Sequence, residues 1–190
     1  MRVSLLCLCL VTMGCTAPEG AVVRFETELG VFDVSVATAA APATAANFLK
    51  YVGEGFYDGG RVHRSVRLDN QRRSDVLIEV IQGGVDRNQR RDGYPAIALE
   101  RTRDTGLLHE DGTISMARGS PDSARSDFFI CIGAQPSLDF GGTRNADGQG
   151  FAAFGTVVAG MDVIRKIHSS PTRGESLNPA IRIVSARRLH

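Results

Sequence analysis

The segment Ile114–Gln135 constrains the fold of this 190-residue chain more than any other stretch of the sequence. It reads ISMARGSPDSARSDFFICIGAQ, in which two short apolar runs flank a loop rich in Gly, Pro and Ser. Short apolar runs between turn-forming residues are typical of β-strands. The segment therefore predicts two strands joined by an irregular loop.

Similar short runs occur along most of the chain. Alternating apolar and polar residues predict a hairpin over residues 23–36, with its turn at Glu28–Gly30. Two helices are expected, at Pro42–Val52 and at Met161–Ile167. The further expected strands are Arg61–Val66, Val76–Ile81, Thr113–Ala117, Phe128–Ile132, Phe151–Val158 and Ala180–Arg188. Many short strands with few helices predict a mainly β protein, and the pattern leaves sandwich and barrel open.

The composition favours a single domain without an overall charge preference. A hydrophobic content of 43% in a chain of this length indicates one sizeable core. The 22 basic and 21 acidic residues nearly cancel, which argues against a nucleic-acid-binding protein. Three of the four cysteines lie in the first fifteen residues, so no internal disulfide is expected. The fourth, Cys131, lies in an apolar run and is interpreted as a small buried hydrophobic residue.

The first fifteen residues have the layout of an export signal. Arg2 precedes the apolar run Val3–Met13, which is too short to span a bilayer. The small residue before Cys15 resembles the cleavage site of bacterial lipoproteins, in which this cysteine becomes the lipidated first residue. Ordinary cleavage near Ala17 is the alternative. We expect residues 1–15 to be a leader, and the protein to be exported as a periplasmic or membrane-anchored lipoprotein.

Four sequence blocks, taken in order, resemble those of the cyclophilin family. They are Val62-His63-Arg64, Ile81-Gln82-Gly83-Gly84, the segment Ile114–Gln135, and Ala153–Val158 followed by Gly160–Ile164. Each block alone is a weak signal, but their common order is specific, and the resemblance spans roughly residues 22–189. Residues 16–21 are then a short tether, and residues 22–190 form a cyclophilin-like domain.

The resemblance implies a fold and an activity. The implied fold is mainly β, a closed eight-stranded antiparallel barrel with two capping helices. The implied activity is peptidyl-prolyl cis-trans isomerisation, without cofactor or metal, by a monomer that assists the folding of exported proteins. Its expected partners are proline-containing polypeptide segments. Neither nucleic acid nor any membrane contact other than a lipid on Cys15 is expected.

The chemistry of the X-Pro bond indicates which residues such an enzyme needs. Rotation faces a barrier of roughly 18–20 kcal/mol, because amide resonance must be broken, but no bond has to be made. Twisting localises the lone pair on the prolyl nitrogen, which then accepts a hydrogen bond from a fixed cation. By the resemblance, Arg64 is this donor, Gln82 binds the substrate backbone and orients the arginine, and Phe129 forms the floor of the proline pocket. Taken singly, Arg64 is typical of a solvated charge and Phe129 of a core residue.

Further residues come from the same resemblance. Its substrate-binding positions are His63, Ala117, Arg118, Leu138 and Phe151. Two polar insertions, at residues 67–75 and 141–150, are expected to be surface loops with solvated charges.

Several positions depart from the family pattern. Glu79 stands where a Phe usually walls the proline pocket, and Val80 stands where Met is common. Arg118 and Asp127 replace Asn and Gln, and either pair with each other across the loop or contact the substrate. Ser137 replaces the Trp that strong cyclosporin binders carry, so weak inhibition by that drug is expected.

Two alternative functions remain open at this point. A binding module or chaperone that holds proline segments without useful catalysis is the main one, and Glu79 favours it. An unrelated metal-binding or hydrolytic barrel is the other. It is disfavoured, because the four histidines show no metal-ligand spacing and no Gly-x-Ser-x-Gly motif occurs. Those histidines are His63, His109, His168 and His190.

Overall fold

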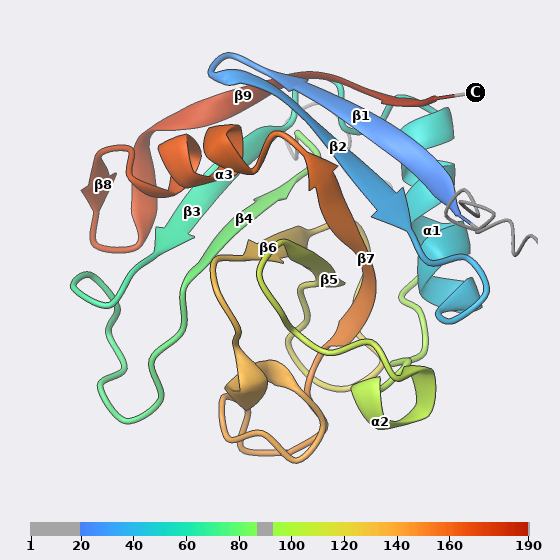
Figure 1. The fold of residues 1–190 in the computed structure, drawn as a ribbon, viewed down its shortest axis with the longest axis vertical. Helices are drawn as coiled ribbons and strands as arrows, with labels where there is room; N and C mark the ends of the chain where they lie inside the picture. Colours follow the sequence, from blue (N-terminus) through green and yellow to red (C-terminus); the bar gives the residue numbers. More distant parts are fainter. Residues whose placement is uncertain (1–19, 87–92, 190) are drawn as a thin grey trace, which may run out of the picture.

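Eight antiparallel strands close into a barrel in the computed structural model, which describes residues 20–86 and 93–189. Around the barrel the strands follow the order β1-β2-β7-β5-β6-β4-β3-β9, and β9 pairs back onto β1 (Figure 1). The strands are β1 (Ala21–Thr27), β2 (Gly30–Val36), β3 (Arg61–Val66), β4 (Val80–Gly84), β5 (Thr113–Met116), β6 (Phe128–Cys131), β7 (Ala152–Ala159), β8 (Thr172–Arg173) and β9 (Ser176–Arg188). The two-residue β8 pairs with β9 alone among the described strands. The predicted mainly β barrel is therefore confirmed.

The two expected helices are present, each one residue longer than predicted. Helix α1 (Pro42–Gly53) begins at a proline, which suits a first turn where the N–H has no intrahelical partner. Helix α3 (Met161–His168) lies across the barrel from α1 (Figure 1). A one-turn helix, α2 (Thr102–Thr105), and a 3-10 turn at Pro136–Leu138 were not predicted. A single turn is too short to show helical periodicity in the sequence.

Strand β6 is buried on both of its faces. Along β6, Phe128 and Ile130 belong to the main core inside the barrel, whereas Phe129 and Cys131 belong to a second, smaller cluster. Successive side chains of a strand point to opposite faces, so a strand covered on both sides has no polar face. This explains why the run from Phe128 to Cys131 contains no polar residue, and it confirms the buried position of Cys131.

The strand predicted at Val76–Ile81 was placed too early in the sequence. The ladder of β4 begins at Val80, and residues 76–79 form a loop. The side chain of Gln71 takes the place of a neighbouring strand for Ile78. Its amide oxygen accepts from the Ile78 N–H, and its amide nitrogen donates to the Ile78 carbonyl, both at 3.2 Å. A side chain satisfies these backbone groups, so Ile78 needs no place in the ladder.

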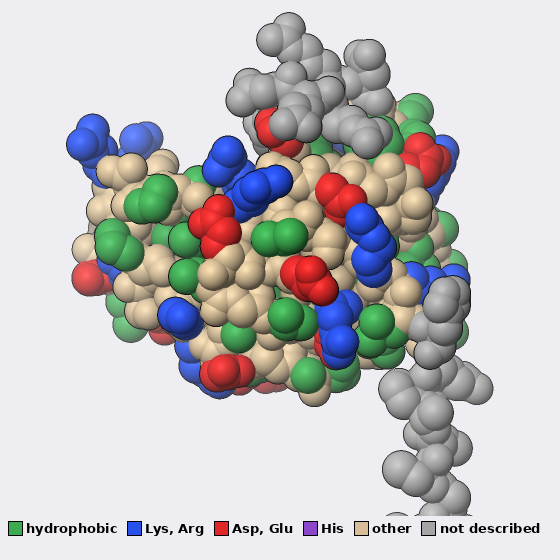
Figure 2. Space-filling view, turned by 90° about the horizontal axis from the view of Figure 1, so that it is seen from above, with side chains coloured by type: hydrophobic (Ala, Val, Ile, Leu, Met, Phe, Trp, Pro, Cys, Tyr) green, Lys and Arg blue, Asp and Glu red, His purple; other side chains and the backbone are tan. Residues whose placement is uncertain are grey.

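Basic and acidic side chains lie next to one another on the face seen in Figure 2, with hydrophobic side chains between them. This mixture agrees with a formal net charge of +1. Within residues 20–86 and 93–189, no helix combines the length and the apolar character that crossing a membrane requires.

Candidate active site

The three residues expected to carry catalysis lie in one row across adjacent strands. Arg64 on β3 is the cross-strand partner of Gln82 on β4, and Gln82 is in turn the partner of Phe129 on β6. Directly paired residues of neighbouring strands project from the same face of a sheet. Pairing of segments far apart in the sequence therefore brings the arginine, the amide and the aromatic ring together.

A β-bulge at His63 turns Arg64 toward this face. Val62 pairs with Gly83 and Arg64 pairs with Gln82, so His63 is the extra residue on β3. Val62 belongs to the main core, and a regular strand would point Arg64, two residues later, into the same core. His63 itself is half-buried and is not among the described residues that line the cavity. Its predicted contact with substrate thus lacks support in the geometry.

The row borders a cavity of about 350 Å³. Five other predicted or family-matched positions line it, namely Val80, Ala117, Arg118, Leu138 and Phe151. The remaining lining residues are Ile78, Arg73, Arg144 and Asn145. These four were not expected from the sequence, because they belong to the loop before β4 and to the two polar insertions, where no family motif marks them.

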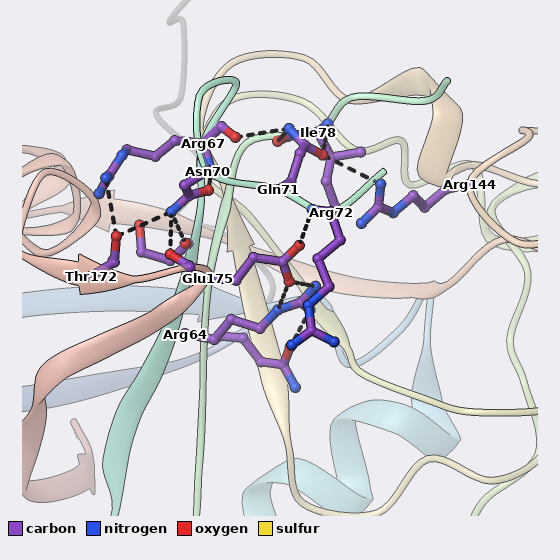
Figure 3. Close-up of polar contacts among 12 residues, drawn as sticks. Arg64, Arg67, Asn70, Gln71, Arg72, Ile78, Arg144, Thr172 and Glu175 are labelled. Atoms are coloured by element: carbon purple, nitrogen blue, oxygen red, sulfur yellow. Dashed lines mark hydrogen bonds and ion pairs between the residues drawn. The ribbon is translucent and has the colours of Figure 1, made fainter. Parts of the chain in front are cut away.

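Arg64 is held firmly at the cavity wall. Its Nη1 donates to Oε1 of Gln82 at 2.9 Å, while Nε and Nη2 both donate to Oε2 of Glu175, at 2.9 and 2.6 Å (Figure 3). The Arg64 side chain remains 32% exposed. A fixed guanidinium that is partly open to the cavity is the arrangement that a hydrogen-bond donor to a twisted amide requires.

Glu175 stays ionised beside the arginine. Burial alone would raise the pKa of its carboxyl, but hydrogen bonds from the Arg64 guanidinium and from the Arg72 amide outweigh this effect. The positive charges of Arg64 and Arg144 act in the same direction, and the pKa of Glu175 lies below its usual value. The carboxylate is therefore available to Arg64 at neutral pH.

The floor of the cavity is aromatic. Phe129 is 5% exposed, and the Phe151 ring meets it edge-on, with 5.3 Å between ring centroids. On another side the His109 ring stacks on Phe129 at 5.7 Å, with 12° between the ring planes. Apolar and aromatic walls suit a pyrrolidine ring, which offers neither a backbone N–H nor a charge.

His109 also joins Ser115 and Asp139 in a buried chain of hydrogen bonds. Its Nδ1 lies 2.7 Å from Oδ1 of Asp139, and its Nε2 lies 3.0 Å from Oγ of Ser115. The same three residue types form hydrolytic triads. Ser115 is fully buried here, so its hydroxyl cannot reach a substrate. The chain instead supports Phe129, whose cross-strand partner is Ser115.

The 141–150 insertion closes one side of the cavity through Arg118. Nη1 and Nη2 of Arg118 donate to the two carboxylate oxygens of Asp147, both at 2.8 Å, and Nε donates to the Gly150 carbonyl at 2.8 Å. These hydrogen bonds lower the pKa of the Asp147 carboxyl to about 2. The pair considered from the sequence, Arg118 with Asp127, does not form, because Asp147 holds the guanidinium.

The position of Glu79 also differs from the expectation. Glu79 is absent from the described residues that line the cavity, whereas Ile78 and Val80 on either side of it are present. The Glu79 carbonyl accepts from the Ile132 N–H at 2.9 Å, which fixes this part of the chain beside β6. Ile78 is 5% exposed and packs in the same cluster as Phe129. At this position the cavity wall is therefore apolar, and the Glu79 side chain, which favoured the binding-module alternative, does not line the cavity.

A second hollow of about 470 Å³ adjoins the cavity. It shares Gln82, Ala117 and Arg118 with the cavity and continues past Ser126 and Asp127. Together the two hollows can receive an extended peptide rather than a single proline residue. No group of His, Cys, Asp and Glu that could hold a metal occurs within residues 20–86 and 93–189.

Comparison with known proteins decides the family. Residues 22–188 match the sequence profile of the cyclophilin-type peptidyl-prolyl cis-trans isomerase/CLD family. The chain belongs to the cyclophilin family. This cyclophilin is 34% identical to a peptidyl-prolyl cis-trans isomerase of Acinetobacter baylyi over 151 residues, which cover 79% of the chain and 73% of the relative. It is 32% identical to peptidyl-prolyl cis-trans isomerase B of Escherichia coli, with 79% of the chain and 85% of the relative covered.

A solved structure shares the fold of this cyclophilin. The crystal structure of a Cryptosporidium parvum cyclophilin superposes with a TM-score of 0.71 at 20% identity, covering 90% of this chain and 98% of that one. The family profile and the curated relatives identify the protein as a peptidyl-prolyl cis-trans isomerase. The predicted family and activity are thus confirmed.

Proposed function

We propose that this cyclophilin accelerates rotation about X-Pro bonds in exported polypeptides and thereby assists their folding. The observation that carries the mechanism is the position of Arg64, held between Gln82 and Glu175 at the wall of a cavity with an aromatic floor. A solved cyclophilin structure related in fold was obtained with the dipeptide Ala-Pro. A proline-containing segment is accordingly the ligand that we propose for this cavity.

In the proposed mechanism the proline ring rests on Phe129 while Arg64 donates to the prolyl nitrogen. That nitrogen is a poor acceptor in the planar amide and a good acceptor in the twisted one, so the contact is stronger at the transition state. Each 1.36 kcal/mol of such differential binding is about tenfold in rate. Gln82 orients the arginine and binds the substrate backbone. Ala117, Arg118, Leu138 and Phe151 form the surrounding walls.

The kinetic test compares the parent protein with Arg64→Ala. The parent is expected to accelerate cis-to-trans conversion of an X-Pro peptide, and the variant to lose about a hundredfold in kcat/KM with an unchanged circular-dichroism melt. Full activity in a folded Arg64→Ala variant would overturn the proposed role of the arginine. No acceleration by the folded parent, despite binding of a proline peptide, would instead favour the binding module. The binding module was favoured by Glu79, but Ile78 and not Glu79 lines the cavity.

The exported location is proposed from the N-terminal sequence. Arg2, the apolar run Val3–Met13 and Cys15 support a lipoprotein leader, and all lie outside the described residues. The test is labelling of the expressing bacterium with a radioactive fatty acid, followed by separation of membrane and soluble fractions. Label should enter the parent protein and be absent from Cys15→Ser. An unlabelled parent that is cleaved near Ala17 would support ordinary secretion, and an uncleaved cytosolic protein would contradict export.

A further inference from the structure

Glu175 lies at the active site although it is far from every other site residue in the sequence. It occupies the turn between β8 and β9, next to Ser176, and Ser176 is the β9 partner of Arg64 in the register with β3. This register brings the Glu175 side chain beside the guanidinium (Figure 3). No motif or resemblance in the sequence assigns it a role.

The contact between Glu175 and Arg64 involves two of the three guanidinium nitrogens. Nε and Nη2 donate to Oε2 of Glu175, and Nη1 donates to Gln82. A guanidinium carries five N–H donors, so one N–H on each terminal nitrogen remains after these three bonds. The carboxylate on one side and the amide on the other therefore set both the position of the guanidinium and the plane in which it lies.

Glu175 is itself fixed from several directions. Its second oxygen, Oε1, accepts from the Arg72 N–H at 3.1 Å, and its backbone carbonyl accepts from the Ser65 N–H at 2.9 Å. Asn70 Nδ2 donates to the Gly174 carbonyl at 3.1 Å, and so ties the turn to the 67–75 insertion (Figure 3). The side chain of Glu175 is only 18% exposed. Because Glu175 is fixed by these contacts, its carboxylate restrains the movement of the Arg64 side chain.

Restraint of this kind matters for the reaction. Arginine has a long side chain with considerable rotamer freedom, which must be lost when it donates to a substrate atom. Charge-assisted hydrogen bonds to a fixed carboxylate remove that freedom before the substrate arrives. Displacement of a catalytic group by about 1 Å can cost about a hundredfold in rate.

We propose that Glu175 is a positioning residue for catalysis, which holds the Arg64 guanidinium in the orientation that the twisted X-Pro bond needs. The inference rests on the role proposed above for Arg64. It gives the turn between β8 and β9, together with the 67–75 insertion, a part in the active site of this cyclophilin.

The test is a double-mutant cycle of Arg64→Ala and Glu175→Ala, measured as kcat and KM for an X-Pro peptide. Glu175→Ala alone is expected to lower kcat about tenfold and to change KM by less than about twofold, since the cavity walls are unaffected. In the Arg64→Ala background the same change should alter the residual rate by less than about twofold, because Glu175 acts through the arginine. Glu54→Ala, which removes an exposed glutamate at the end of α1, is the matched control and should leave kcat unchanged.

Two further measurements keep the test decisive if Glu175→Ala folds poorly. Glu175→Gln preserves size and one acceptor oxygen, and should recover part of the lost kcat. The Nε–H signal of Arg64, assigned by its absence in Arg64→Ala, should show slow solvent exchange in the parent and fast exchange in either Glu175 variant. Parent-like kcat in a folded Glu175 variant would overturn the inference while leaving Arg64 in place. If Glu175→Ala lowered kcat by the same factor in the parent and in Arg64→Ala, the inference would also be overturned. Full activity of Arg64→Ala would overturn the proposed roles of both Glu175 and Arg64.

Discussion

Two adjacent phenylalanines at the start of β6 perform different tasks because they face opposite sides of the barrel wall. The Phe128 ring lies inside, 5.4 Å from Phe25 and 5.6 Å from Tyr57 between ring centroids. Phe129 lies outside and lines the proline cavity. We expect Phe128→Ala to destabilise the fold by about 3–5 kcal/mol, because it leaves a void in the core.

Phe129→Ala should affect substrate binding more than stability, the reverse of what is expected for Phe128→Ala. Its ring borders a cavity that already exists, so the loss of stability should be smaller than for Phe128→Ala, while KM for an X-Pro peptide should rise about tenfold. Denaturant unfolding and steady-state kinetics of the two variants test the contrast. Equal effects of both substitutions on stability and on KM would contradict the assignment of the two faces.

The pair Ile78 and Glu79 gives a second prediction at single residues. Ile78→Ala should raise KM for an X-Pro peptide about threefold or more, since it removes apolar wall area from the cavity. Glu79→Ala should leave kcat/KM within about twofold of the parent, because its side chain does not line the cavity. A large gain in activity on Glu79→Ala would instead show that this glutamate weakens catalysis.

At the level of elements, the 141–150 insertion is held to the barrel by the pair Arg118 and Asp147. The pKa of Asp147 in the folded protein, about 2, lies below the ordinary value of 3.8, and the hydrogen bonds from Arg118 are the main cause. A depressed pKa means that the pair contributes its full stabilisation above about pH 4 and loses it as the pH falls toward 2. Carboxyl NMR of the Asp147 side chain measures this titration directly.

The variant Arg118→Ala is the control for that titration. Without the guanidinium, the pKa of Asp147 should rise toward the ordinary value, and the insertion should exchange its amide protons faster. Titration of Asp147 near pH 4 in the parent protein would show that the pair does not hold the insertion in solution.

For the molecule as a whole, charge is nearly balanced but unevenly placed. The net charge is +1, yet four arginines line the proline cavity, namely Arg64, Arg73, Arg118 and Arg144. Three of them are paired with carboxylates, while Arg144 donates to the carbonyl of Val76 at 2.6 Å. Burial, with the positive charges of Arg73 and Arg64, lowers the pKa of Arg144. Because Arg144 is not paired with a carboxylate among the described residues, we expect the cavity to favour substrates that bring a negative charge.

A peptide series tests this preference. Peptides with Glu beside the proline should show about threefold higher kcat/KM than those with Lys at low ionic strength, and the ratio should fall toward one in high salt. Arg144→Ala should reduce the ratio, whereas Arg165→Ala, which removes an exposed arginine of α3, should not. Equal rates for Glu and Lys peptides at low salt would contradict the prediction.

The sequence alone determined most of the longer elements of this protein, and its family. Periodicity and turn residues are local properties, so β3, β6 and both longer helices could be located to within a residue, and the four ordered blocks identified the cyclophilin barrel. The start of β4 could not be located, because a side-chain amide, Gln71, substitutes for a strand partner at Ile78.

Only the tertiary structure decided how the active site is completed. The partner of Arg118, the apolar wall at Ile78, the arginines of the insertions and the carboxylate of Glu175 all depend on contacts between segments distant in the chain. Glu175 is 111 positions from Arg64 and carries no pattern of its own, since a single glutamate in a turn is typical of any exposed loop. Its position beside Arg64 follows from the pairing of β9 with β3, two strands that are far apart in the sequence.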